Sequence, residues 1–122
     1  MKSILLVFLG GGLGSALRFI IGKWLNPFYK IPLGTFTVNL VGSLIIGIIL
    51  GYAAKGDSLS SSQNLLLATG FCGGFTTFSA FSYENSTFLK SGDITSFAVY
   101  TSLSIAGGLA AVLAGLWISK YL

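Results

Sequence analysis

The chain has 122 residues, of which 53% are hydrophobic and only 8% are charged, whereas a soluble domain carries about 25% charged residues. This composition excludes a soluble globular fold and favours one small membrane domain over 1–122. With no histidine, one cysteine and three acidic residues, the sequence excludes histidine catalysis, an intrachain disulfide and a Cys/His zinc site, so no enzyme is expected. Its net charge of +4 comes from scattered cations, which does not indicate a nucleic-acid partner.

Four apolar blocks predict an all-α membrane protein with four transmembrane helices and both termini on the same side. Each block has the roughly 20 residues that span about 30 Å of hydrocarbon. The blocks are Ile4–Leu25, Leu33–Ala54, Gln63–Lys90 and Thr95–Ile118. Polar loops at Pro27–Pro32, at Lys55–Ser62 (with a Gly56-Asp57 turn) and at Gly92-Asp93 connect them.

The first block contains glycines at helical spacing, because Gly10 and Gly14 are four residues apart. Small residues at this spacing let helix backbones approach closely in lipid. The block lacks the cleavage pattern of a signal peptide, and glycines interrupt its apolar run. Arg18 is expected near the interface, where its side chain reaches water or loop carbonyls.

The second block carries a carboxamide, Asn39, near its middle. A polar group at this depth is costly, so it usually faces a pore, a binding site or another helix. Thr35, Asn39 and Ser43 are spaced by four and predict one narrow polar track. An interhelical hydrogen bond from Asn39 that only holds the bundle together is an equally open interpretation.

The third block predicts a helix that breaks at bilayer depth. Gly70, Gly73 and Gly74 weaken the helix, and hydroxyl residues follow directly. An unwound segment exposes backbone groups that need partners, and an ion is one such partner. The alternative is an intact helix that its neighbours support. Phe78 and Phe81 share one side of the segment, which predicts the wall of a pathway or simple packing.

Two further polar features accompany the last two blocks. Glu84 is the only acid inside a predicted span, where it could carry protons or make hydrogen bonds near the interface. Tyr100 and Ser104 are four residues apart and lie on one face of the fourth helix.

The cations divide almost evenly between the two predicted membrane sides. Lys2, Lys55 and Lys120 lie on the side of the termini, and Lys23, Lys30, Lys90 and Arg18 belong to the other side. The orientation of a membrane protein normally follows the Lys and Arg count in its short loops, so this even division gives little preference for either orientation. Either another determinant sets one orientation, or both orientations insert and pair head to tail.

The available groups suit a small ion better than a large substrate. The Asn39 amide, hydroxyls and aromatic ring edges can contact a small anion, and carbonyls of an unwound helix can bind an alkali cation. The alternative is a proton-coupled small-cation or drug exporter that uses Glu84, although such exporters need an early membrane acid and the first helix has none. A structural membrane protein is a third class.

Three motifs resemble the CrcB/Fluc family of fluoride channels. They are Gly11–Arg18, Gly34–Gly42 and Gly70–Phe81, of which the third is the most specific. The resemblance extends over the whole chain in length, number of spans and their order. It implies a passive, fluoride-selective channel that exports fluoride across the plasma or inner membrane. It also implies an antiparallel, dual-topology homodimer with two fluoride pathways.

The resemblance also implies roles for individual residues. The implied fluoride pathway comprises Asn39, Thr77, Phe78, Ser79, Phe81, Tyr100 and Ser104. A sodium ion at the dimer centre is implied on the main-chain carbonyls of Gly73 and Thr76. Glu84 matches a family glutamate near a pathway mouth, and Arg18 matches a structural arginine. Related chains continue the helix-4 hydroxyls where this chain has Gly108, which leaves the outer end of that track in doubt.

Overall fold

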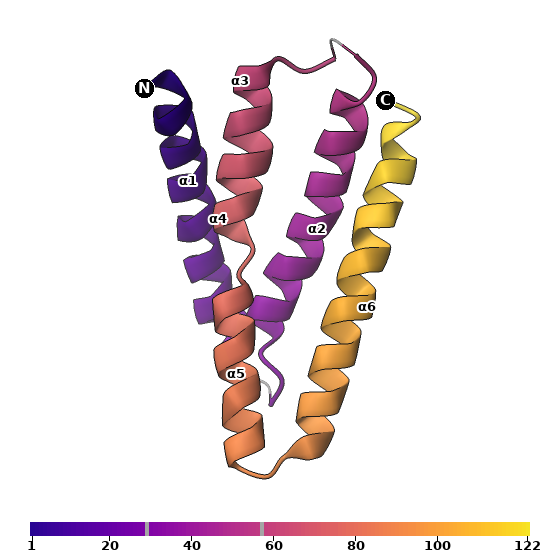
Figure 1. Ribbon diagram of the computed structural model, residues 1–122. Coiled ribbons are helices and arrows are strands. Elements are labelled where there is room, and N and C mark those ends of the chain that lie inside the picture. The colour runs from indigo at the N-terminus through magenta and orange to yellow at the C-terminus, as the bar shows by residue number, and fades with distance from the viewer. Residues whose placement is uncertain (29, 57) are drawn as a thin grey trace.

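A computed structural model describes residues 1–28, 30–56 and 58–122, and within them helices are the only regular secondary structure (Figure 1). The segments are α1 (Lys2–Leu25), the 3-10 turn η1 (Asn26–Phe28), α2 (Leu33–Ala53), α3 (Ser61–Asn64), η2 (Leu65–Cys72), α4 (Gly73–Phe75), α5 (Phe78–Lys90) and α6 (Ile94–Ser119). Tyr29 and Asp57 lie outside the described residues, and with them part of the predicted Pro27–Pro32 loop and of the Gly56-Asp57 turn.

Four helical stretches of the described chain are long and apolar enough to cross a membrane, as predicted. They are Lys2–Leu25, Leu33–Ala53, Ser61–Lys90 and Ile94–Ser119. The predicted bounds agree with them to within two residues. Both termini lie at the same end of the bundle, which is also confirmed (Figure 1).

The third span is a series of four short helices rather than one rod. α3 and η2 lead into α4, and α5 follows after a break (Figure 1). η2 is a π-helix, in which the Gly73 amide donates to the Ala68 carbonyl five residues earlier. The sequence analysis predicted the break but missed this π-helical stretch. Such wide turns are rare and often occur at functional sites.

Glycines bring α1 into backbone contact with the third span. A Cβ atom on Gly10 would collide with the Leu66 carbonyl oxygen, and one on Gly74 would collide with the Gly11 carbonyl oxygen. α1 therefore packs mainly on η2 and α4, whereas α2 packs mainly on α6. The predicted close packing is confirmed, and it fixes α1 against the broken segment.

Few large side chains are buried, because most apolar residues point outward. Tyr100, Val38 and Cys72 are the largest fully buried side chains among the described residues. Exposed leucines, isoleucines and phenylalanines cover the outer surface of all four spans, as expected of helices that face lipid.

Local capping fixes where the third span begins and ends. Ser60 caps α3 in a capping box with Gln63, so the neighbouring Ser61 and Ser62, which the sequence suggested as caps, lie inside the helix instead. At the other end, Gly92 has a φ of 78° and stops α5. The Asp93 amide then donates to the Phe88 carbonyl over 2.9 Å, which closes a Schellman motif.

Candidate functional site

The break in the third span consists of two extended residues, Thr76 and Thr77. Their ψ angles are 157° and 118°, far from helical values. Asn39 on α2 supports this segment with both ends of its amide: Nδ2 donates to the Thr77 carbonyl over 3.1 Å, and Oδ1 accepts from the Thr77 amide over 2.7 Å. Asn39 thus pairs with Thr77 as a neighbouring strand would.

The break removes the helical donors of several carbonyls, among them those of Gly73 and Thr76. In a continuous helix the Thr77 amide would donate to the Gly73 carbonyl, but it donates to Asn39 instead. The Ala80 amide would donate to the Thr76 carbonyl, but it donates to Thr77 Oγ1 over 3.2 Å and caps α5. The carbonyl oxygens of Gly73 and Thr76 are therefore released by the same contacts that form the break.

The neighbouring carbonyl of Gly74 is occupied by a side chain. Arg18 Nε on α1 donates to this oxygen over 2.9 Å. Arg18 therefore binds a backbone carbonyl of the broken segment and places a fixed cation beside it. Water or loop carbonyls were the predicted partners of Arg18, whereas the structure shows a carbonyl beside the break, a contact that adds to the glycine contacts between α1 and the third span.

A cavity of about 570 Å³ opens beside the break. Its lining includes five predicted pathway residues and both predicted sodium ligands. These residues are Asn39, Thr77, Phe78, Phe81 and Ser104, with Gly73 and Thr76. Five elements contribute to the lining, and no acidic residue of the described chain is among those that line it. The cavity therefore carries no side-chain charge, and its mostly apolar wall holds a few polar groups.

Several groups on this cavity can donate to an anion. Asn39 Nδ2 has a second N–H beyond its bond to Thr77. Ser104 Oγ is buried and has no hydrogen-bond partner among the described residues. The Phe78 and Phe81 ring centroids lie 5.9 Å apart, and Phe78 is 78% exposed. Ring edges carry partial positive charge, and so does the N-terminus of α5, which begins at Phe78.

Tyr100 and Glu84 lie in a separate network. The Tyr100 hydroxyl donates to Glu84 Oε1 over 2.8 Å, and Thr35 Oγ1 donates to Oε2 over 2.6 Å. Tyr100 is fully buried and does not itself line the large cavity, although its ring centroid lies 5.2 Å from that of Phe81, which does. Thr35 likewise turns away from Asn39 and Ser43. The polar track predicted on α2 therefore divides into two sites.

This network borders a second, smaller cavity of about 170 Å³. Arg18, Thr35, Glu84 and Thr77 are among its lining residues, so Thr77 touches both cavities. Asn26, which the sequence analysis treated only as a helix end, accepts from the Thr35 amide over 3.1 Å. Its position at the C-terminal end of α1 was visible in the sequence, but its partner on α2 was not.

Ser79, also predicted on the pathway, lines neither cavity. It is exposed, and its hydroxyl lies 3.1 Å from Thr77 Oγ1. In the structure its hydroxyl therefore hydrogen-bonds with the Thr77 hydroxyl that caps α5.

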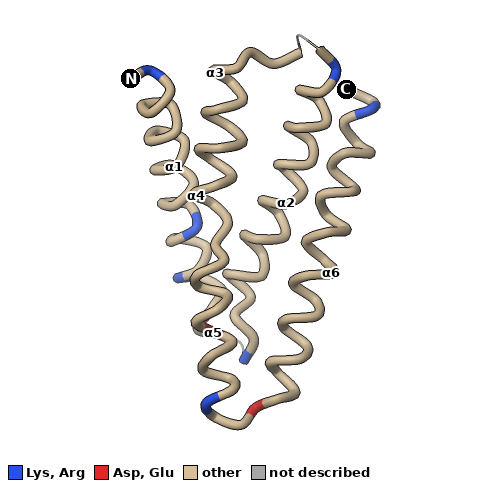
Figure 2. The backbone as a smooth tube through the Cα atoms, in the orientation of Figure 1, with Lys and Arg blue, Asp and Glu red and all other residues tan. Residues whose placement is uncertain are grey.

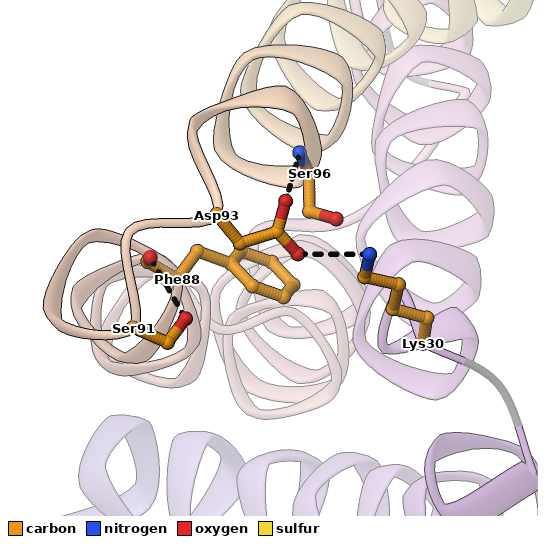
Figure 3. A network of polar contacts seen from close by, with 5 residues as sticks. All are labelled: Lys30, Phe88, Ser91, Asp93 and Ser96. Atoms are coloured by element: carbon orange, nitrogen blue, oxygen red, sulfur yellow. Dashed lines mark hydrogen bonds and ion pairs between the residues drawn. The ribbon is translucent and has the colours of Figure 1, made fainter.

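An ion pair joins two loops at the end of the bundle away from the termini (Figure 3). Lys30 Nζ lies 3.1 Å from Asp93 Oδ2, and the Asp93 carboxylate also accepts from the Ser96 amide over 3.1 Å. Hydrogen bonding from Ser96 and the neighbouring Lys30 ammonium hold the pKa of the Asp93 carboxyl below its usual range.

Cations lie toward both ends of the bundle, as the sequence predicted (Figure 2).

Comparison with known proteins agrees with this architecture. The sequence profile described as "CrcB-like protein, Camphor Resistance (CrcB)" matches residues 5–116. A protein named fluoride-specific ion channel FluC from Gloeothece citriformis is 48% identical over 122 residues, which cover 98% of each chain. Proteins of the same name from Flavobacterium psychrophilum and Leptospira interrogans are 44% and 43% identical, over 100% and 98% of this chain and 100% and 95% of theirs. With this match and these full-length relatives, the chain belongs to the CrcB-like family.

Proposed function

We propose that this protein is a passive, fluoride-selective channel of the plasma or inner membrane. The observation that carries the proposal is the full-length similarity to curated fluoride-specific channels, at up to 48% identity. Fluoride leaves the cytoplasm through the protein down its electrochemical gradient, which protects the cell from its accumulation. The protein is a channel and not an enzyme.

The large cavity supplies the chemistry that a small, hard anion requires. The free N–H of Asn39 and the unpaired Ser104 hydroxyl can replace water around the ion. The edges of Phe78 and Phe81 add weak positive potential without a tightly binding cation. An ion that contacts only neutral donors is bound strongly enough to enter the cavity and weakly enough to leave it.

The proton-coupled exporter is the weaker candidate. Both Glu84 oxygens accept hydrogen bonds, from Thr35 and Tyr100, and Glu84 does not line the large cavity. If the exporter were correct, Glu84→Gln would abolish proton uptake coupled to cation efflux. We expect no such coupling in the wild-type protein.

An antiparallel homodimer of dual topology is the assembly that we infer. One supporting observation is the near-equal division of cations between the two ends of the bundle (Figure 2). Another is Phe78, whose ring is 78% exposed on the single chain although it borders the cavity. A cysteine introduced near Lys2 should crosslink to one near Lys90 of a second copy. Exclusive crosslinks between like ends would contradict this assembly.

A sodium ion at the break fits the donors that the chain supplies. The carbonyls of Gly73 and Thr76 lack their helical donors, and neutral carbonyl oxygens suit an alkali cation. No cluster of metal-ligating acids, cysteines or histidines occurs among the described residues, so the carbonyls would be the ligands. When bound, the ion adds a fixed positive charge beside the anion path.

The decisive experiment compares fluoride and chloride efflux from liposomes that contain the purified protein. We expect rapid fluoride efflux that discharges the membrane potential, with chloride efflux near the protein-free background. Equal efflux of both anions, or no efflux of either, would refute the proposed function.

A further inference from the structure

Ser43 on α2 has a hydroxyl with no assigned role in the structure. Its side chain lines the large cavity one helical turn beyond Asn39. A serine inside a helix commonly donates to the carbonyl four residues earlier. Ser43 Oγ makes no such bond, and no hydrogen bond within the described part of the chain uses it. The hydroxyl is therefore available to whatever occupies the cavity.

Gly108 on α6 leaves the space next to Ser43 open. A Cβ atom built on Gly108 would lie 3.7 Å from Ser43 Oγ, at ordinary van der Waals distance. Both residues line the cavity, and Ser104 lies one turn before Gly108 on α6. The cavity wall thus has the Ser104 hydroxyl from α6 at one height. One turn further along α6, beside Gly108, it has the Ser43 hydroxyl from α2.

We propose that Ser43 is a fluoride-contacting residue that continues the line of donors formed by Asn39 and Ser104. The missing side chain at Gly108 is what exposes the Ser43 hydroxyl to the ion. The line of donors therefore crosses from α6 to α2. This inference rests on the proposed fluoride conduction and names a further recognition residue for it.

A compensating pair of variants tests the inference. Ser43→Ala should lower fluoride efflux from liposomes about tenfold, because a hydrogen bond to a charged group is lost. Gly108→Ser in the Ser43→Ala background returns a hydroxyl to the same space and should restore most of the efflux. Ser102→Ala removes an exposed hydroxyl from α6 and should leave efflux unchanged.

The outcomes separate this inference from the proposed function. A wild-type protein that does not conduct fluoride would refute the function itself. A conducting wild type with equal efflux in Ser43→Ala would refute the role of Ser43 alone. Reduced efflux that Gly108→Ser does not restore would assign Ser43 a packing role and also refute the inference.

A second measurement covers the case in which Ser43→Ala does not fold. Ser43→Cys in a Cys72→Ser background places a single thiol on the cavity. We expect it to react with a small water-soluble methanethiosulfonate reagent, and to react more slowly in sodium fluoride than in sodium chloride. Equal rates in the two salts would overturn the proposal.

Discussion

Replacing Asn39 with alanine removes both hydrogen bonds that support the unwound part of the third span. The Thr77 amide loses its 2.7 Å bond to Oδ1, and the Thr77 carbonyl loses its 3.1 Å bond to Nδ2. Thr77 is buried, so water does not replace these partners freely. Asn39→Ala is therefore expected to change the shape of the break and not only the cavity wall.

The magnitude follows from the number of groups left unpaired. A buried backbone group without a partner costs about 1–3 kcal/mol, so the two groups together cost about 2–6 kcal/mol. The protein can recover part of this if the Thr77 amide donates to the Gly73 carbonyl, as in a continuous helix. That carbonyl would then be occupied, and the proposed sodium site would lose a ligand.

Thermal unfolding in detergent, with and without sodium, measures both consequences. We expect Asn39→Ala to unfold at a lower temperature than the wild type, and to lose the stabilisation that sodium gives the wild type. Asn64→Ala is the matched control, since the Asn64 Oδ1 has no partner in the described structure. An Asn39→Ala protein with unchanged melting temperature and unchanged sodium response would refute this account of the break.

Three further substitutions probe the contacts around the break and the loops. Arg18→Leu removes the donor to the Gly74 carbonyl and should destabilise the protein by about 1–3 kcal/mol and lower fluoride efflux, as measured by unfolding and by efflux from liposomes. Gly42→Ala places a methyl group against the Thr76 side chain and should weaken the sodium-dependent rise in melting temperature. Asp93→Asn should lower the melting temperature at pH 7, and this difference should shrink as the pH falls through the depressed pKa of the Asp93 carboxyl, because the stabilising charge is then lost.

Matched variants separate the expected effects from general damage. Arg18→Lys keeps the positive charge but not the Nε donor, so stability that equals the wild type would argue against the Gly74 contact. Gly12→Ala adds a methyl group where no side chain and no neighbouring helix lies within 4 Å, and it should behave as the wild type. A melting-temperature difference between Asp93→Asn and wild type that does not shrink on acidification would contradict the assignment for Asp93.

The sequence predicted the spans and the position of the break because both depend on composition. Apolar blocks of about 20 residues have few alternatives in a membrane. Gly73, Gly74 and the hydroxyl residues after them mark where a helix is weakest. Asn39 was also identified correctly as an unusual residue at this depth, although pathway lining and interhelical bonding remained alternatives. In the structure the Asn39 amide binds Thr77 on the third span and also borders the large cavity, whereas its place on an ion pathway stays a prediction.

The predictions that depended on partners from other helices were less complete. Periodicity grouped Thr35 with Asn39, but Thr35 bonds to Glu84 and belongs to the second cavity. Tyr100 was grouped with Ser104 for the same reason, yet its hydroxyl also reaches Glu84. Spacing identifies residues on one face of a helix, whereas the tilt of neighbouring helices decides which partner each residue meets. The π-helix η2 has no comparable signal in the sequence.

The glycine contacts between α1 and the third span set a limit on protein engineering. Alanine scanning and glycine-to-alanine substitutions for thermal stability both add a methyl group. At Gly10, Gly14 and Gly74 this methyl group would push the two backbones apart. Gly12, on the same helix, has open space around it and accepts a new side chain. Small spin or fluorescent probes of the membrane interior are therefore better attached at Gly12 than at Gly10 or Gly14, two residues away on either side.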